Sequence, residues 1–474
     1  MLGRRKAPLR TRLGGALPPG RSILCALALA AFAHPAVAQE LRGTLAETPP
    51  TSSDDLGFPA FESAPDTSFA EPPLEDAMPP SPAEIVEPRR KRRIEEDDPY
   101  APLGVRAGSF ILKPSFETSG GYESNPRAEA GGKGSTFTRA EADLDVASDW
   151  ARHQFTAKIR GAYIAYQDIH DLDTPDFAGD MALRLDARSD LKIDLAIRGT
   201  IGSDRPGDPE VPESVVGRTE VYTSGISVGA TYKPNRLSIG STLSADRYFY
   251  ADSKLNNGDT LDNSPRNYTA YELRERIGYE LSPALEPFVE VAGNRHLYEA
   301  DDDFLQEKRD STGVEALLGA RFEPSALIAI EGKAGYGRRD PDSSKLETID
   351  GLIAEGSLIW RPSVLTTMTL TGASSIDETT LPGASGAVNR STSIKVEHAL
   401  RRNLILTGQL AYDRVDYEGA DFVEDQYSAD LGVEYRFTRS VALRARVAHL
   451  KLESSVPGED YTSDLIEMGL RFRR

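Results

Sequence analysis

The sequence predicts an all-β fold, a transmembrane antiparallel up-and-down β-barrel of about 18 strands (16 is the alternative count) that follows a disordered N-terminal extension. Three observations predict it. From Gly108 onward apolar and polar residues alternate in block after block, the connections alternate between tight turns and longer polar loops, and aromatic residues recur on one face of a block. No run of 18 or more apolar residues provides a membrane-spanning helix instead.

The composition excludes other classes of protein. The 474 residues include 55 Lys plus Arg and 74 Asp plus Glu, and the net charge of −19 argues against nucleic-acid binding. The single cysteine, Cys25, can form neither an intramolecular disulfide nor a Cys-based metal cluster, and we expect no metal and no cofactor. The length would suit three average domains, but all-β barrels remain single domains well beyond the usual size.

Residues 1–38 have the pattern of a secretory signal peptide. A basic leader begins at Arg4, an apolar run covers 23–33, and the small residues Ala36 and Ala38 follow. A charged start, a short apolar middle and an A-x-A end predict cleavage between Ala38 and Gln39. Export from the cytoplasm follows.

Residues 39–100 form an acidic, proline-rich segment. It contains 11 prolines, six basic and 15 acidic residues, and almost no periodic apolar pattern. Such a segment cannot bury enough apolar surface to offset its loss of chain entropy, so we expect it to be disordered in the periplasm. Its basic run at 89–93 is either a docking site for an anionic partner or a stretch neutralised by the acidic residues 95–98.

Residues 101–474 are predicted to form the barrel. In 191–201 the odd positions from Leu191 are apolar or glycine, whereas Lys192, Asp194 and Arg198 occupy even positions, and only a strand sorts such residues onto two faces. Blocks of this kind lie near 108–123, 135–149, 153–167, 175–188, 191–203, 218–232, 237–250, 266–281, 287–299, 310–322, 327–339, 351–360, 365–378, 389–400, 404–417, 425–437, 441–451 and 462–473.

The connections between these blocks sort by length. Tight turns at 233–236, 282–285 and 401–403 alternate with long polar loops such as 204–217 and 251–264. An even number of strands with short turns at one end and long loops at the other is typical of a bacterial outer-membrane barrel. Both ends of the barrel segment then lie at the short-turn, periplasmic end.

Aromatic residues recur at a spacing that suits a membrane. Tyr222 and Tyr232 lie on one face, ten residues apart, and Tyr427 with Tyr435 repeats the arrangement at eight. At about 3.3 Å per residue and a tilt near 40°, ten residues span roughly 25 Å along the barrel axis. This matches the height of a lipid-facing band between two aromatic girdles. A soluble sandwich or propeller would not need strands this long.

Two segments carry a family resemblance: 102–110 (PLGVRAGSF) and 121–126 (GYESNP). With the strand rhythm that follows, residues 100–474 resemble the outer-membrane β-barrel porins of Gram-negative bacteria known as beta-barrel porin 2. The resemblance implies an outer-membrane location and, for some members, an association with surface polysaccharide, but it transfers no functional residues. The end departs from the usual barrel-assembly signal, because Arg473 and Arg474 follow Phe472.

If the apolar set faces lipid, the other set faces the lumen. So many charges are costly in a dry core, so they indicate water inside, and 18 strands enclose enough space for a channel. The alternative is a lumen whose charges pair while loops close the top. The predicted lumen-lining residues are Arg160, Arg184, Lys192, Asp194, Arg198, Arg274, Arg276, Glu434, Arg436, Arg444 and Arg446.

The third external loop, 204–217, is a candidate constriction. By analogy with general porins it would fold inward and narrow the pore; the alternative is an ordinary surface loop. Its predicted constriction residues are Asp204, Arg205, Asp208, Glu210 and Glu213.

The interpretation that unites these features is a porin-like passive channel for small hydrophilic solutes. The alternative is a barrel component or scaffold of a surface-polysaccharide export or secretion system. We expect no enzyme and no catalytic residues, since G-x-S-x-G, H-E-x-x-H and P-loop patterns are absent. The expected partners are outer-membrane lipid and lipopolysaccharide, the barrel-assembly machinery, other copies in a homo-trimer and polysaccharide-export proteins, with no nucleic acid.

Overall fold

The computed structural model describes residues 99–474 except 205–209, 213, 301–307, 378, 382, 421 and 457. The predicted signal peptide, and the predicted acidic segment up to residue 98, lie outside the described residues. In the part that is described, no helix is long and apolar enough to cross a membrane.

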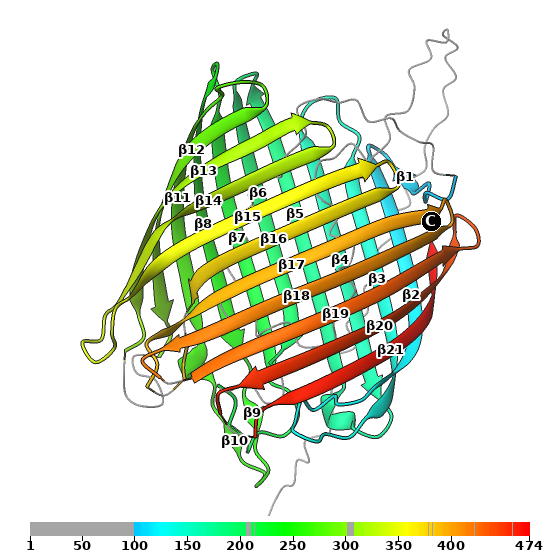
Figure 1. Cartoon of the computed structure of the whole chain (residues 1–474), viewed down its shortest axis with the longest axis vertical. Helices are drawn as coiled ribbons and strands as arrows, with labels where there is room; N and C mark the ends of the chain where they lie inside the picture. Colours follow the sequence, from blue (N-terminus) through cyan, green and yellow to red (C-terminus); the bar gives the residue numbers. More distant parts are fainter. Residues whose placement is uncertain are drawn as a thin grey trace, which may run out of the picture. The chain divides into compact units, whose positions relative to one another are not determined.

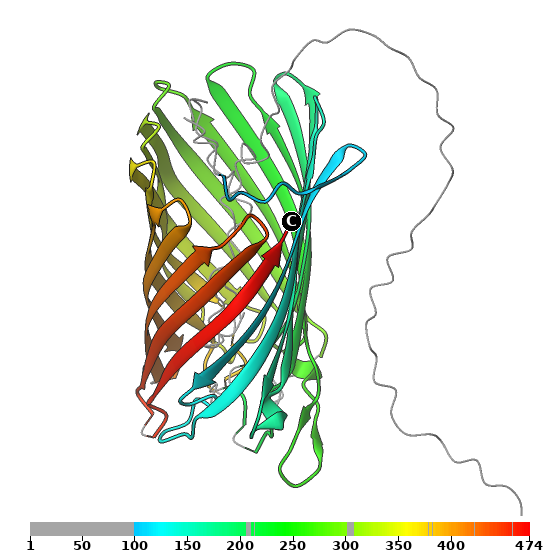
Figure 2. The same cartoon turned by 90° about the vertical axis from the view of Figure 1, so that its right-hand side faces the viewer.

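The described residues form a closed antiparallel barrel of 18 strands, which confirms the predicted fold (Figure 1). Each strand pairs with its neighbours along the chain, and β2 pairs with β21 to close the ring. Figure 2 shows these two strands side by side. The barrel strands are β2 (Phe110–Glu123), β3 (Ser135–Ser148), β4 (Gln154–Tyr166), β5 (Thr174–Arg188), β6 (Leu191–Ser203), β7 (Glu220–Tyr232), β8 (Leu237–Tyr250), β11 (Tyr268–Tyr279), β12 (Leu285–Tyr298), β13 (Ser311–Ser325), β14 (Ile328–Pro341), β15 (Ile349–Ser363), β16 (Thr366–Asp377), β17 (Gly386–Arg401), β18 (Leu404–Glu418), β19 (Phe422–Arg436), β20 (Val441–Ser454) and β21 (Tyr461–Arg473).

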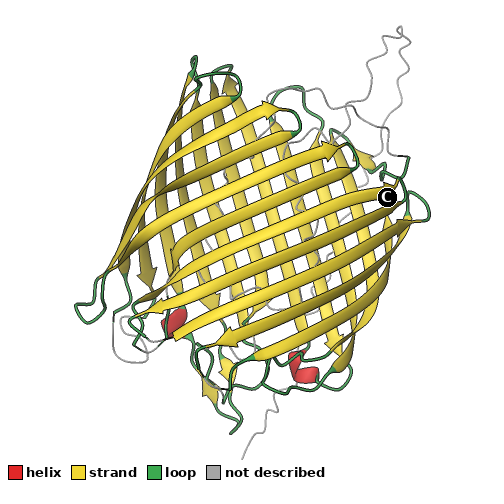
Figure 3. Ribbon diagram, viewed as in Figure 1, coloured by secondary structure: helices red, strands yellow, loops and turns green. Residues whose placement is uncertain are grey.

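Five small elements were not predicted (Figure 3). Strand β1 (Val105–Ala107) pairs with the start of β2. In the loops, β9 (Ser253–Lys254) and β10 (Thr260–Leu261) form a short hairpin, and two 3₁₀ turns cover His170–Leu172 and Ser264–Arg266. Two- and three-residue segments are too short to carry a periodic pattern, so alternation could not reveal them.

The two ends of the barrel differ as the sequence predicted. At one end the connections hold two to five residues; at the other most hold six or more, and 204–219 and 251–267 are the longest. The exception is 419–421 at the loop end. The barrel begins with β2 and finishes with β21 at the turn end. A β-bulge lies beside each two-residue turn, where it adds local twist.

The outward face carries an apolar band between two aromatic girdles, which confirms the predicted spacing. The girdle near the turn end contains Trp150, Tyr232, Tyr279, Phe322, Trp360, Tyr435, Phe437 and Phe472, all exposed. The girdle near the loop end contains Tyr122, Tyr163, Phe177, Tyr222, Phe249, Tyr271, Tyr336 and Tyr427, also exposed. Aromatic girdles mark the two interfaces of a bilayer, so the hydrocarbon lies between them.

Glu275 is an acidic exception within this band. It lies on the outward face of β11, midway between Tyr271 and Tyr279, with Leu273 on the same face. The Ser241 hydroxyl on β8 donates to its carboxylate at 2.6 Å. A carboxylate that faces hydrocarbon lowers the stability of the barrel in the membrane.

Candidate functional site: the lumen and its outer mouth

The eleven predicted lumen residues all lie on the face opposite the exposed apolar band, which is the inward face of the closed barrel. Two ion pairs there join neighbouring strands, Arg160 with Asp176 (2.9 Å) and Arg184 with Asp194 (3.0 Å). A third, Arg198 with Asp246 (2.6 Å), reaches from β6 to β8 across Gly225 of β7. Lys192, by contrast, is exposed. The role of these residues in selecting solutes stays a prediction.

One wall of the lumen carries an excess of carboxylates. It lies on β11 to β15 and consists of Arg274, Arg276, Lys333, Glu272, Glu290, Glu315, Glu331 and Glu355. Glu290 is 3% exposed and accepts hydrogen bonds from Arg274 at 2.5 Å and from Lys333 at 2.9 Å. Five carboxylates face three cations, so this acidic wall favours cations near it.

A second wall, on β19 to β21, β2 and β3, is rich in arginine. Its ion pairs are Arg444 with Glu117 (2.8 Å), Arg446 with Asp430 (2.5 Å), Arg436 with Glu434 (2.6 Å), Arg471 with Asp143 (3.2 Å) and Arg139 with Glu141 (2.7 Å). Arg473, one of the two arginines that follow Phe472, also forms an ion pair with Glu434 at 3.3 Å. This arginine-rich wall is close to neutral, unlike the acidic wall.

Glu210 of the third external loop contacts a loop on a distant part of the ring. Its carboxylate accepts hydrogen bonds from the Thr380 backbone N–H (2.9 Å), the Thr380 hydroxyl (2.6 Å) and the Thr379 hydroxyl. Loop 204–219 joins the fifth and sixth barrel strands and loop 378–385 joins the 13th and 14th, so the contact connects nearly opposite sides of the ring. Of the predicted constriction residues, Arg205, Asp208 and Glu213 lie outside the described residues.

Two buried arginines extend this connection between loops. Arg266, 2% exposed, pairs with Asp204 at 2.7 Å and reaches Glu210 at 3.7 Å. Burial raises the pKa of Asp204, and Arg266 opposes that shift. Arg309 donates to the backbone carbonyls of loop 378–385, at 2.7 and 2.8 Å. Sequence reasoning missed both arginines, because no local pattern shows which distant loop a side chain reaches.

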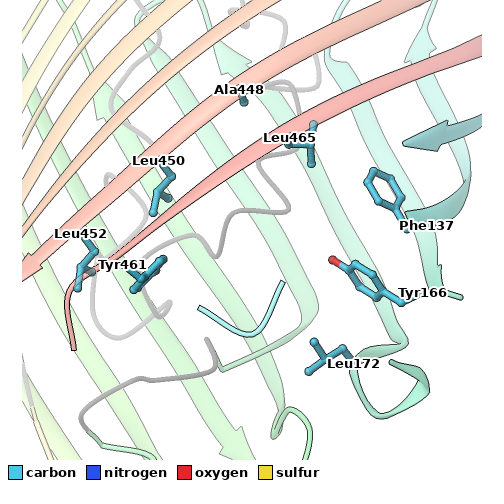
Figure 4. Close-up of a cluster of buried hydrophobic side chains, with 8 residues drawn as sticks. All are labelled: Phe137, Tyr166, Leu172, Ala448, Leu450, Leu452, Tyr461 and Leu465. Atoms are coloured by element: carbon cyan, nitrogen blue, oxygen red, sulfur yellow. The ribbon is translucent and has the colours of Figure 1, made fainter. Parts of the chain in front are cut away.

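Apolar residues point inward at the loop end of the strands. One cluster comprises Phe137, Tyr166, Leu172, Ala448, Leu450, Leu452, Tyr461 and Leu465, with side chains inside the barrel (Figure 4). Three further clusters are built around Tyr248 and Tyr268, Leu317 and Ile353, and Tyr417 and Phe422. We call this end of the barrel, with its inward apolar clusters, the rim.

A pocket lies against the arginine-rich wall. It holds about 940 Å³ of empty space, part of it open to solvent, and is lined by β2, β3 and β17 to β21. Six of its lining residues are basic and five are acidic. Sequence reasoning placed Arg436, Arg444 and Arg446 in the lumen but could not group them with Lys395, which the curvature of the wall brings to the same pocket.

Comparisons with known proteins agree with this architecture. The model of the family described as Putative beta-barrel porin 2 matches residues 98–474, which confirms the resemblance found in the sequence. No curated protein sequence matches the chain.

The chain is also similar, at low identity, to three solved structures. The copper transporter OprC is 11% identical, with a TM-score of 0.44 over 78% of this chain and 81% of its own. OccK2 (OpdF) of Pseudomonas aeruginosa is 11% identical, with a TM-score of 0.40 over 77% of this chain and 97% of its own. OpdK of Pseudomonas aeruginosa is 11% identical, with a TM-score of 0.37 over 77% and 99%.

Proposed function

Because this chain belongs to the family described as Putative beta-barrel porin 2, we propose that it is a passive channel for small hydrophilic solutes in the bacterial outer membrane. The observation that carries the proposal is the placement of charge. Within the apolar band, arginine, lysine and carboxylate side chains line the inward face of a ring of 18 strands. An array of this size requires water around it, and a ring of this width accommodates water.

The loop contacts support a narrowed outer mouth. Glu210 and its threonine partners connect loops from opposite sides of the ring. Arg309, in a third loop, donates a hydrogen bond to the Thr379 carbonyl of loop 378–385. We call these connected loops, 204–219, 299–310 and 378–385, the strap. A solute entering from outside would pass beside the strap, so the strap sets the size limit of the channel. The inward charges below it would set the preference for ions.

The position of the first described residues supports a periplasmic N-terminal segment. Residues 99 and 100 lie next to the turn end, where the Arg439 guanidinium donates to the Pro99 carbonyl at 2.7 Å. Short turns face the periplasm in outer-membrane barrels. Protease added to intact cells should leave an epitope at residues 60–70 untouched, and should remove it once the outer membrane is permeabilised.

Single-channel recording in planar bilayers tests the channel proposal. The purified full chain should pass ions by itself, and Glu210→Ala should raise its conductance because the strap loses the carboxylate that joins two loops. Glu220→Ala, at a half-exposed position of β7 beside the outward Tyr222, is the matched control and should leave the conductance unchanged. A barrel that folds and inserts but passes no current, with or without Glu210, would contradict the proposal and favour a scaffold role.

A further inference from the structure

The pocket against the arginine-rich wall has polar atoms that the described residues leave without partners. Arg446, 8% exposed, donates through Nε to Asp430 at 2.5 Å, but its buried Nη2 has no hydrogen-bond partner. Lys395 lines the same pocket and forms no ion pair with any described residue. A buried donor without an acceptor is costly, so Arg446 favours an anionic group beside it, and the half-exposed Lys395 adds a second positive charge to the pocket.

The pocket also offers an acceptor without a donor. Glu141 is 5% exposed and accepts from Arg139 through Oε2 at 2.7 Å, whereas its buried Oε1 has no partner. A bare inorganic anion cannot donate to a carboxylate, but a hydroxyl group can. The two observations together describe a ligand with a negative group and at least one hydroxyl.

The centre of the pocket has room for such a ligand. Gly432 lies on its surface, and a Cβ built there would meet nothing closer than the Thr407 Cβ at 3.7 Å. The neighbouring Thr407 and Ser119 are small and carry hydroxyls. A larger side chain at 432 would therefore project into the empty space and leave the ion pairs of the wall intact.

We propose that this pocket is a transit site for a small carboxylate that carries hydroxyl groups, such as a sugar acid or hydroxy acid. Its carboxylate accepts from Arg446 and Lys395, and one hydroxyl donates to Glu141. The inference rests on the proposed channel function and specifies the class of solute. The near balance of six basic and five acidic lining residues lets such a ligand bind and leave, as conduction requires.

Interruption of the single-channel current tests the site, with three solutes as probes. Gluconate carries a carboxylate and hydroxyls, acetate lacks the hydroxyls, and glucose lacks the charge. Gluconate added to the KCl bath should interrupt the current in a concentration-dependent way, at concentrations about tenfold lower than acetate or glucose require.

Two variants locate the effect. Lys395→Gln and Gly432→Val should each weaken gluconate block by about fivefold to tenfold. Arg446 is left unchanged because its removal would leave Asp430 buried without its partner. Lys451→Gln, on the outward face of β20 and outside the pocket, is the matched control and should leave the block unchanged.

The outcomes separate the two proposals. A chain that inserts without conducting contradicts the channel function itself. A conducting chain on which gluconate acts no more strongly than acetate or glucose, or whose gluconate block survives both pocket variants, overturns the transit site and leaves the channel function standing.

Discussion

Within the membrane band the apolar residues of the strands point outward, whereas at the rim they point inward. On β20, Val447 points outward and Arg446 inward within the band, but a few residues later His449 and Lys451 point outward while Leu450 points inward. The backbone continues without a break, so only the surroundings change. Hydrocarbon outside selects apolar residues there, whereas water outside the rim selects charges and leaves the apolar residues to pack together inside.

The rim is therefore held together like a soluble barrel. Its inward clusters bury leucine and aromatic side chains almost completely, with Leu450 at 1% and Leu465 at 0% exposure. The inward face of the membrane band, in the residues that the structure describes, is lined with ion pairs instead. Stability at the rim should therefore respond to cavities, and stability in the band should respond to charges placed on the lipid side.

The largest effect is expected from a cavity at the rim. Leu465→Ala should lower the free energy of unfolding by about 2–5 kcal/mol, because the side chain is fully buried in the cluster with Phe137. Urea unfolding from phospholipid vesicles measures it. Leu470→Ala on the outward face of the same strand is the control; lipid fills the space it vacates, so its cost should be smaller. Equal costs would contradict a packed rim.

A charged side chain on the lipid-facing side of the band should lower the free energy of unfolding nearly as much as the cavity at the rim. Leu431 lies midway between Tyr427 and Tyr435 on the outward face of β19, and Leu431→Arg should destabilise the barrel by about 2–4 kcal/mol. Thr462→Arg, outward but at the rim, should be close to neutral because water surrounds it. The same unfolding assay compares the two variants. A neutral Leu431→Arg would show that the band does not face hydrocarbon.

Removal of the charge in the band should stabilise the protein. Glu275→Leu replaces a carboxylate that faces hydrocarbon, and we expect a gain of about 1–2 kcal/mol in vesicles. The same substitution at the outward Glu453 of the rim should bring no gain, because that carboxylate is already in water beside Lys451. Loss of stability in Glu275→Leu would mean that another polar group, supplied by a partner, meets the carboxylate.

The smallest effect is expected at an exposed ion pair of the rim. Arg338 and Asp340 are neighbours on the outward face of β14, at 2.7 Å, and both are about half exposed. Arg338→Ala should change the free energy of unfolding by less than about 1 kcal/mol, because water screens such pairs. A larger change, measured at low and high salt, would show that the outer face of the rim is less accessible to water than the structure indicates.

The sequence predicted the barrel well because its evidence is local. Alternation and turn chemistry are set by residues close in the chain, and they also placed Arg446 and Glu434 on the inward face. Ion pairs between strands of one hairpin, such as Arg446 with Asp430, follow from register once the turn is known.

The contacts between the external loops could not be predicted, because they join distant parts of the chain. Glu210 and Thr380 are 170 residues apart, and no pattern in either loop indicates the other. The rim left a signal that was overlooked. On β20 the alternating apolar residues stand at odd positions as far as Val447. From Ala448 through Leu450 and Leu452 they stand at even positions, although no residue is inserted between the two series.

Labelling of single cysteines with a water-soluble maleimide shows whether the inward face meets water in the membrane band and is dry at the rim. In a Cys25→Ser background, Gly432→Cys should react in the folded, membrane-inserted protein and Leu431→Cys should not, because only the inward position meets water. At the rim the order should reverse, with His449→Cys reactive and Leu450→Cys protected. The same order at both levels, or no reaction at any inward position of the band, would contradict a water-filled lumen beneath an apolar rim.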